Sequence, residues 1–141
     1  GKNIFPALGE VAGKQDKFFQ INGDDYDTPD GTCIRDYIHI NDITTGHISA
    51  LECLGNQKGI EIINLGTGKG FSVKEIINSF EVSNNIKINF NIGPRRKGDI
   101  ETCYADVNKA YKLLNWQAKY NLEDMCRDYW NWKTRNEEEK A

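Results

Sequence analysis

The segment IEIINL, residues 60–65, is a nearly continuous apolar run, and such a run is typical of a strand that is covered on both faces. It leads through a glycine-rich stretch into SVKE, residues 72–75, which has the spacing of a helix capping box. Apolar residues then follow at helical intervals as far as Phe80. A buried strand followed by an amphipathic helix predicts a mixed fold, α/β or α+β.

The rest of the chain alternates between strand-like and helix-like segments. Further strands are expected in residues 18–22, 35–40 and 86–92, the last with its alternating apolar residues facing the core. Further helices are expected in residues 3–15 and after caps at Asp42, Asp106 and Asn121, with His47 on the core-facing stripe of the second. A chain of 141 residues can bury a proper core, so we expect one domain over residues 1–136 and a disordered tail at 137–141.

The balance of charge argues against two classes of partner. The 21 acidic and 18 basic residues give a net charge of −3, which provides no overall attraction for nucleic acid or for an anionic membrane. We also expect no signal peptide and no span across a bilayer. The four cysteines are widely spaced without a C-x-x-C pair, so we expect reduced thiols in a cytoplasmic protein and no metal site.

The stretch CIRDYIHIND, residues 33–42, carries unusually many polar side chains for a predicted strand. Successive side chains of a strand point to opposite faces, so Arg35, Tyr37 and His39 should share one side and Asp36 the other. A cation and a phenol would then face the same way. That face is either a solvated surface or the wall of a cleft, and the pattern alone does not decide between them.

A second polar stretch is GPRRKGD, residues 93–99, which places three basic residues together in an acidic chain. An arginine fork matches phosphate oxygens, and the nearby Asp99 could accept hydrogen bonds from a sugar diol. Together they would suit a nucleotide, although a basic turn on the surface could have the same sequence. The loop GTGKG, residues 66–70, does not have the glycine spacing of a dinucleotide or phosphate loop, and we interpret it as a structural turn.

Several motifs, taken together, resemble one enzyme family over nearly the whole chain. They are NIFP at 3–6, the run from GDDYDTPDGT through IRDYIHI to HISAL at 23–51, NLGTGKGFSVKEII at 64–77, PRRKGD at 94–99 and LNWQAKYNLEDMCRDYWNW at 114–132. In this order they resemble the C-terminal half of the UDP-glucose 4-epimerases, which are extended short-chain dehydrogenases/reductases. The resemblance implies a small α+β-like substrate-binding domain.

The resemblance also implies a reaction and a cofactor. In this family NAD takes a hydride from C4 of a UDP-hexose, the keto sugar turns over, and the hydride returns to the other face. The family's G-x-x-G-x-x-G strand and helix, and its catalytic set of a Y-x-x-x-K with a partnering serine or threonine, have no counterpart in this chain. We therefore expect the NAD-binding Rossmann half to lie elsewhere in a longer protein, and this portion alone to be inactive. The longer protein is expected to be a homodimer.

Site residues follow from the resemblance, position by position. Those expected to contact the UDP-sugar are Asn3, Ile4, Phe19, Gln20, Asn22, Arg35, Tyr37, Val73, Arg96, Asp99 and Cys103. In the family pattern the two arginines bind the diphosphate, the residues around Gln20 line the uracil pocket, and the aspartate accepts the ribose hydroxyls. No catalytic, cofactor-binding or metal-binding residue is expected in this chain.

Cys103 bears on substrate choice. The family has either a bulky tyrosine or a smaller residue at this position, and a small one leaves room for a substituent on C2 of the sugar. We therefore expect that N-acetylated UDP-hexoses are accepted as well. The alternatives are the substrate half of another nucleotide-sugar enzyme, a non-catalytic UDP-sugar-binding module, and a purely structural domain.

The missing half has a consequence for the surface. By the same resemblance, the strand at 60–65 and the helix before it should complete a sheet in the longer protein. In this chain alone they should leave an apolar face uncovered, to be hidden by self-association or to become partly disordered.

Overall fold

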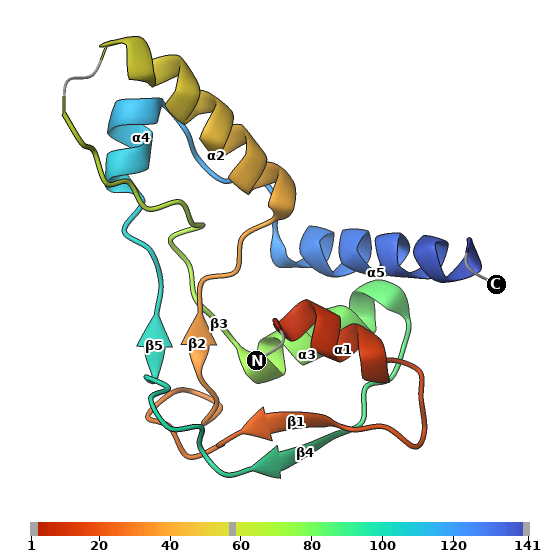
Figure 1. Ribbon diagram of the computed structural model, residues 1–141. Coiled ribbons are helices and arrows are strands. Elements are labelled where there is room, and N and C mark those ends of the chain that lie inside the picture. The colour runs from red at the N-terminus through yellow and green to blue at the C-terminus, as the bar shows by residue number, and fades with distance from the viewer. Residues whose placement is uncertain (1–2, 57–58, 140–141) are drawn as a thin grey trace.

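The computed structural model describes residues 3–56 and 59–139 and shows a mixture of helices and short strands (Figure 1). In chain order the elements are α1 (Ile4–Val11), β1 (Phe19–Asn22), β2 (Ile34–Arg35), α2 (Ile40–Cys53), the 3-10 turn η1 (Leu54–Asn56), β3 (Phe71–Ser72), α3 (Val73–Asn84), β4 (Phe90–Gly93), β5 (Thr102–Cys103), α4 (Asn108–Leu114) and α5 (Leu122–Glu138). The predicted α/β class is confirmed.

The strands form two small sheets. In the first, β1 and β4 are parallel, with Phe19 opposite Phe90 and Asn22 opposite Gly93. In the second, β2 lies in the middle, antiparallel to β3 and parallel to β5. Arg35 at the end of β2 lies opposite Cys103 in β5. Both sheets therefore join segments that are far apart in the sequence.

The core is divided into two clusters. The larger one lies among α1, β1, α3 and α5 and contains Leu8, Val11, Ala12, Ile21, Ile76, Ile77, Phe80, Ile88, Leu122 and Cys126. The smaller one is formed by Ala110, Leu114 and Trp116 and packs against residues of α2 and of the segment before β3. In Figure 1, α2 and α4 lie at one end of the molecule, away from α1, α3 and α5.

Local hydrogen bonds explain where α3 and α5 begin. Ser72 accepts from the backbone N–H of Glu75 and donates its own N–H to the Glu75 carboxylate, so the predicted capping box is present. Asn121 and Asp124 form a second capping box at the start of α5. This helix continues to Glu138, so the start of the tail that we predicted to be disordered is helical, while residues 140–141 lie outside the described part.

The prediction of a strand at residues 60–65 is wrong for this structure. The segment runs without strand pairing, and Ile60 and Ile62 are 92% and 78% exposed. A strand needs a neighbour for its backbone hydrogen bonds, and the described residues offer none at this edge. On α2 the apolar side chains of Ile48, Leu51 and Leu54 are also exposed. The predicted uncovered apolar face is therefore present.

Two other strand predictions were too long. In residues 86–92 the strand begins only at Phe90. The predicted core-facing alternation is also wrong, because Ile88 is buried while Phe90 and Ile92 are about half exposed. In residues 35–40 the strand ends at Arg35. The chain then runs on without strand pairing to the start of α2.

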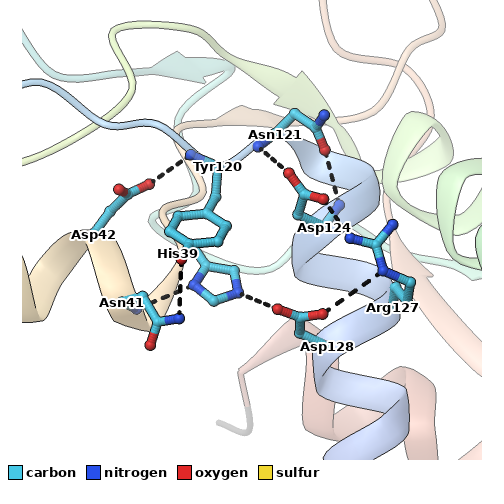
Figure 2. Close-up of polar contacts among 8 residues, drawn as sticks. All are labelled: His39, Asn41, Asp42, Tyr120, Asn121, Asp124, Arg127 and Asp128. Carbon is cyan, nitrogen blue, oxygen red and sulfur yellow. Dashed lines mark hydrogen bonds and ion pairs between the residues drawn. The ribbon is translucent and has the colours of Figure 1, made fainter.

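Helix α2 begins earlier than predicted, and its cap is His39 (Figure 2). The Nδ1 atom of His39 accepts a hydrogen bond of 3.0 Å from the backbone N–H of Asn41. Its Nε2 atom lies 3.3 Å from the carboxylate of Asp128 in α5, and its ring stacks on Tyr120 with 4.2 Å between the centroids. His39 therefore joins the start of α2 to α5, and the predicted strand face shared with Arg35 and Tyr37 does not extend to it, because the strand ends at Arg35.

Asp42, the predicted cap, has a different role. Its carboxylate is 1% exposed and accepts hydrogen bonds of 3.0 Å from the backbone N–H groups of Lys119 and Tyr120. Two backbone donors from a distant loop satisfy this buried carboxylate, which would otherwise lose its hydration without a hydrogen-bond partner. A prediction that considers only neighbouring residues cannot show that Asp42 binds a distant loop and does not cap its own helix.

His47 and Asp106 also depart from expectation. His47 is exposed, with Nδ1 2.7 Å from the carbonyl oxygen of Ile43, because α2 turns its Gly46 side toward Leu65 and Trp116 and leaves the opposite stripe uncovered. Asp106 accepts a hydrogen bond of 2.9 Å from the N–H of Asn108. The N-cap residue of α4 is nevertheless Val107.

Candidate functional site

A cavity of about 680 Å³ opens between α1, β1, the end of β2 and the turn that follows β4. Ten of the eleven residues expected to contact a UDP-sugar line it: Asn3, Ile4, Phe19, Gln20, Asn22, Arg35, Tyr37, Val73, Arg96 and Asp99. They come from five separate stretches of the sequence. Folding therefore brings them around one hollow, and the cleft interpretation of the face bearing Arg35 and Tyr37 is favoured over a flat solvated surface.

Two guanidinium groups converge on one carboxylate in this cavity. Arg96 donates a hydrogen bond of 2.7 Å from Nη2 to Oδ1 of Asp99, and Nη2 of Arg35 lies 3.8 Å from the same oxygen. The hydrogen bond to Asp99 raises the pKa of Arg96. Two cations held this close together form a ready site for an anion with several oxygens.

The fold fixes the two arginines to different degrees. Arg35 donates from Nη1 to the carbonyl oxygens of Ile34, at 2.8 Å, and Glu101, at 3.3 Å, so it is anchored on the β2–β5 ladder. Arg96 lies in an exposed turn, where the described side-chain contact is the one to Asp99. Gly98 in this turn has φ of +90°, a conformation that favours glycine, and it directs Asp99 back toward Arg96.

Tyr37 forms the wall beside Arg35. Its ring meets Phe5 of α1 edge to face, with 6.2 Å between the centroids. Burial raises the pKa of its hydroxyl group, and the nearby Arg35 opposes this only in part. The hydroxyl therefore stays protonated at neutral pH and can donate a hydrogen bond into the cavity.

Sequence reasoning missed seven residues of the cavity lining. These are Ala7, Glu10, Val11, Phe18, Ile21, Gly23 and Cys33. The first three could have been found, because they follow Asn3 and Ile4 at the three- and four-residue spacing of one helix face. Cys33 could also have been found, since it lies two residues before Arg35 on an extended segment.

Cys103 is the one predicted site residue that does not line the cavity. It is exposed in β5, opposite Arg35, and its carbonyl oxygen accepts a hydrogen bond of 3.1 Å from the N–H of Asp36. Its side chain is therefore close to the cationic end of the cavity in the fold without forming part of its wall.

Asp36 holds the glycine-rich loop in place. Its carboxylate accepts hydrogen bonds from the backbone N–H groups of Thr67, at 3.0 Å, Gly68, at 3.0 Å, and Ala105, at 3.2 Å, and from the Thr67 hydroxyl at 2.6 Å. The loop GTGKG thus directs the N–H groups of Thr67 and Gly68 to a carboxylate of the same chain. This confirms the interpretation as a structural turn.

Residues 3–56 and 59–139 contain no group of three or more His, Cys, Asp or Glu side chains arranged to hold a metal ion. None of the helices over these residues is both long enough and apolar enough to cross a bilayer.

Comparison with known proteins relates the chain to enzymes of nucleotide sugars. A family model described as GDP-mannose 4,6 dehydratase matches residues 1–129. A UDP-glucose 4-epimerase of Cyamopsis tetragonoloba is 47% identical over 135 residues, which cover 95% of this chain and 39% of that protein. The chain thus spans about 40% of the length of the curated relatives it matches.

The solved structures that match are also epimerases of which this chain covers about 40%. The UDP-glucose 4-epimerase of Bifidobacterium longum in complex with NAD+ and UDP matches with a TM-score of 0.90 and 44% identity, over 96% of this chain and 40% of that one. The UDP-Glc/GlcNAc 4-epimerase of Campylobacter jejuni matches with a TM-score of 0.79 and 39% identity, over 94% of this chain and 39% of that one.

Proposed function

Because the chain belongs to the family described as GDP-mannose 4,6 dehydratase, we propose that it is the C-terminal, UDP-hexose-binding portion of an NAD-dependent UDP-glucose 4-epimerase. The observation that carries this proposal is the convergence of Arg35 and Arg96 on Asp99 at one end of a cavity. The high similarity to UDP-glucose 4-epimerases over 95% of the chain supports it.

In this proposal each part of the cavity has a role. The two guanidinium groups replace the water around the diphosphate and balance its charge. Asp99 accepts the hydroxyl groups of the ribose, and β1, with Phe19, Gln20 and Asn22, lines the pocket for the base. The nucleotide is bound tightly while the hexose is bound only loosely. The hexose can therefore turn, which is necessary because the reaction takes place on both faces of one carbon.

The described residues do not fit an NAD site. The one glycine-rich loop that follows an apolar run, residues 66–70, already directs the N–H groups of Thr67 and Gly68 to the carboxylate of Asp36, so these two groups do not bind a pyrophosphate. NAD, which supplies the hydride chemistry when it is bound, would be held by the part of the protein that precedes this portion. We expect the 141-residue chain alone to bind nucleotide but not to turn over sugar.

The exposed apolar side chains support the proposal that another part of a longer protein packs against this chain. Ile48, Leu51, Leu54, Ile60 and Ile62 are between 50% and 92% exposed, and single domains rarely leave so many large apolar side chains open. We propose that the NAD-binding portion covers them. The homodimer of the longer protein stays a prediction, as does its cytoplasmic location, which the four free cysteines support.

Substrate range is the finer part of the proposal. The exposed Cys103 thiol is small and lies opposite Arg35, and a relative of similar fold carries both glucose and N-acetylglucosamine in its name. We propose that UDP-N-acetylhexoses are accepted. In the longer protein, Cys103→Tyr should abolish turnover of the acetylated sugars and spare UDP-galactose, and equal losses on both would contradict the idea.

Titration of the 141-residue chain with UDP, followed by NMR, tests the proposed function. We expect binding in the millimolar range, roughly −4 kcal/mol, because much of the enclosing protein is absent. Arg96→Ala should weaken it by about tenfold or more, since a charged hydrogen bond is lost. Arg95→Ala is the matched control, because Arg95 pairs with Asp25 and does not line this cavity.

The nucleobase provides the other comparison. Since the family model is described by a GDP-sugar, GDP should be titrated alongside UDP. Tighter binding of UDP supports the proposal, whereas a preference for GDP would favour another nucleotide-sugar enzyme. If neither nucleotide shifts the resonances of cavity residues, the cavity is not a nucleotide site.

A further inference from the structure

The chain has two histidines, and the same ring atom of each has the opposite kind of partner at helix α2. Nδ1 of His39 accepts a hydrogen bond of 3.0 Å from the backbone N–H of Asn41. Nδ1 of His47 lies 2.7 Å from the carbonyl oxygen of Ile43, which can only accept. His47 can therefore keep a proton on Nδ1 in every state, whereas His39 caps α2 only while its Nδ1 carries no proton.

The other ring nitrogen of His39 completes the assignment. Nε2 lies 3.3 Å from the carboxylate of Asp128 in α5, and a carboxylate accepts hydrogen bonds. A neutral ring with its proton on Nε2 thus satisfies both partners (Figure 2). The side chain is 6% exposed and its ring stacks on Tyr120, so it has little room to turn toward solvent when its charge changes.

Charged and titratable side chains lie around the ring on both helices and on the loop before α5. In the described part of the chain they are Asp42 of α2, Tyr120 of the loop, and Asp124, Arg127, Asp128 and Tyr129 of α5, while α1 contributes the apolar Phe5. Arg127 pairs with both Asp124 and Asp128, so part of this negative charge is already balanced. A cationic ring would still be attracted by Asp128 through Nε2, but its new Nδ1–H would point at the N–H of Asn41.

We propose that His39 is a pH-sensitive link between α2 and α5, which holds both helices while its ring is uncharged and releases the first turn of α2 when the ring is protonated. The proton comes from solvent and binds Nδ1. The N–H of Asn41 then loses its acceptor, while Nε2 keeps its proton and its partner Asp128. This role of His39 goes beyond the proposed function, because it does not depend on which ligand the cavity binds.

The link lies between the two ends of the molecule. α5 belongs to the larger core cluster, whereas α2 packs with α4 around the smaller one (Figure 1). Residues 36–39 join β2 to α2 without strand pairing, and Tyr37 of the cavity wall is one of them. Asp36 anchors one end of this segment on Thr67, and His39 anchors the other end on α5. Protonation of His39 should therefore loosen both the start of α2 and the segment that carries Tyr37.

The test follows the backbone amide of Asn41 in the 141-residue chain by NMR between pH 8 and pH 5, the range in which histidine changes its charge. We expect its protection from solvent exchange, corrected for the intrinsic effect of pH, to fall by about fivefold or more on acidification, as for a lost helix cap. In His39→Asn the protection should stay constant, because asparagine caps a helix and does not titrate. His47→Gln is the matched control on the same helix and should behave like the unmodified chain.

Two measurements on the unmodified chain need no variant. Correlation spectra of the ring nitrogens show which of them carries the proton in His39, and we expect Nε2 at pH 8. The amides of Ile76 and Ile77 in the buried part of α3 should keep their protection down to pH 5, which separates release of α2 from general unfolding by acid.

Several outcomes would overturn the proposed link. A proton on Nδ1 of His39 at pH 8 excludes it as the acceptor for Asn41. Constant protection of the Asn41 amide over the whole range shows that protonation does not release α2. A fall of equal size in His39→Asn, or its absence in His47→Gln, assigns the change to another group, and an equal fall at Ile76 and Ile77 assigns it to general unfolding.

Discussion

Replacement of Asp36 should reveal how strongly the cavity depends on a carboxylate that faces away from it. Asp36 lies between Arg35 and Tyr37 in the sequence and ties together three segments: the end of β2, the loop at residues 66–68 and the chain after β5. It accepts hydrogen bonds from three backbone N–H groups and from one hydroxyl group. Asp36→Ala leaves these part-buried donors without an acceptor.

The magnitude follows from the number of bonds. A hydrogen bond to a charged group contributes roughly 1.5–3 kcal/mol. Water can reach part of this site, so we take the lower end for two or three of the bonds and expect a loss on the order of 3–5 kcal/mol. In Asp36→Asn one oxygen remains as an acceptor, and the loss should be about half as large. Domains have stabilities of about 5–15 kcal/mol, so Asp36→Ala should remove a large share of the unfolding free energy.

Urea unfolding, monitored by circular dichroism and tryptophan fluorescence, measures the effect. Asp106→Ala serves as the control, because Asp106 is exposed and accepts a single backbone hydrogen bond, from Asn108. It should lower the unfolding free energy far less. If Asp36→Ala were no more destabilising than Asp106→Ala, the carboxylate would not hold these segments together, and our account of the loop at 66–68 would be refuted.

Three further predictions concern other parts of the molecule. His39→Ala should cost about 1 kcal/mol more stability than His39→Asn, because asparagine keeps a helix cap while both variants lose the contact with Asp128; equal losses in urea unfolding would speak against a capping role. The 141-residue chain should self-associate with rising concentration in analytical ultracentrifugation, and Leu51→Glu should reduce this, because Leu51 is 66% exposed; a monomer at every concentration would be inconsistent with this view. Burial raises the pKa of Cys126 to about 11, so at pH 8 only about 0.1% of it is thiolate and iodoacetamide should leave it unmodified while it alkylates the exposed Cys103; labelling of both residues at one rate, read by mass spectrometry, would rule this out.

Local sequence signals predicted the features that depend on neighbouring residues. The predicted capping box at Ser72 and the predicted helix cap at Asn121 are both present, because the bonds that form them span three residues. The helical face from Asn3 onward and the strand at β1 also follow from short-range periodicity. The resemblance to a known family identified ten of the cavity-lining residues, which no local pattern could have grouped.

The tertiary structure decided what the sequence left open. His39 takes the capping role that the sequence suggests for Asp42, because the N–H groups of Lys119 and Tyr120 reach Asp42 only after folding. Residues 60–65 have the composition of a buried strand but lack a pairing partner among the described residues, and a strand is defined by its neighbours and not by its own letters. The pairing of Arg35 and Arg96 with Asp99 has the same origin, since Arg35 is more than sixty positions away from the other two along the chain. Composition and periodicity fixed the class of the fold, and long-range hydrogen bonds and ion pairs fixed which polar groups meet.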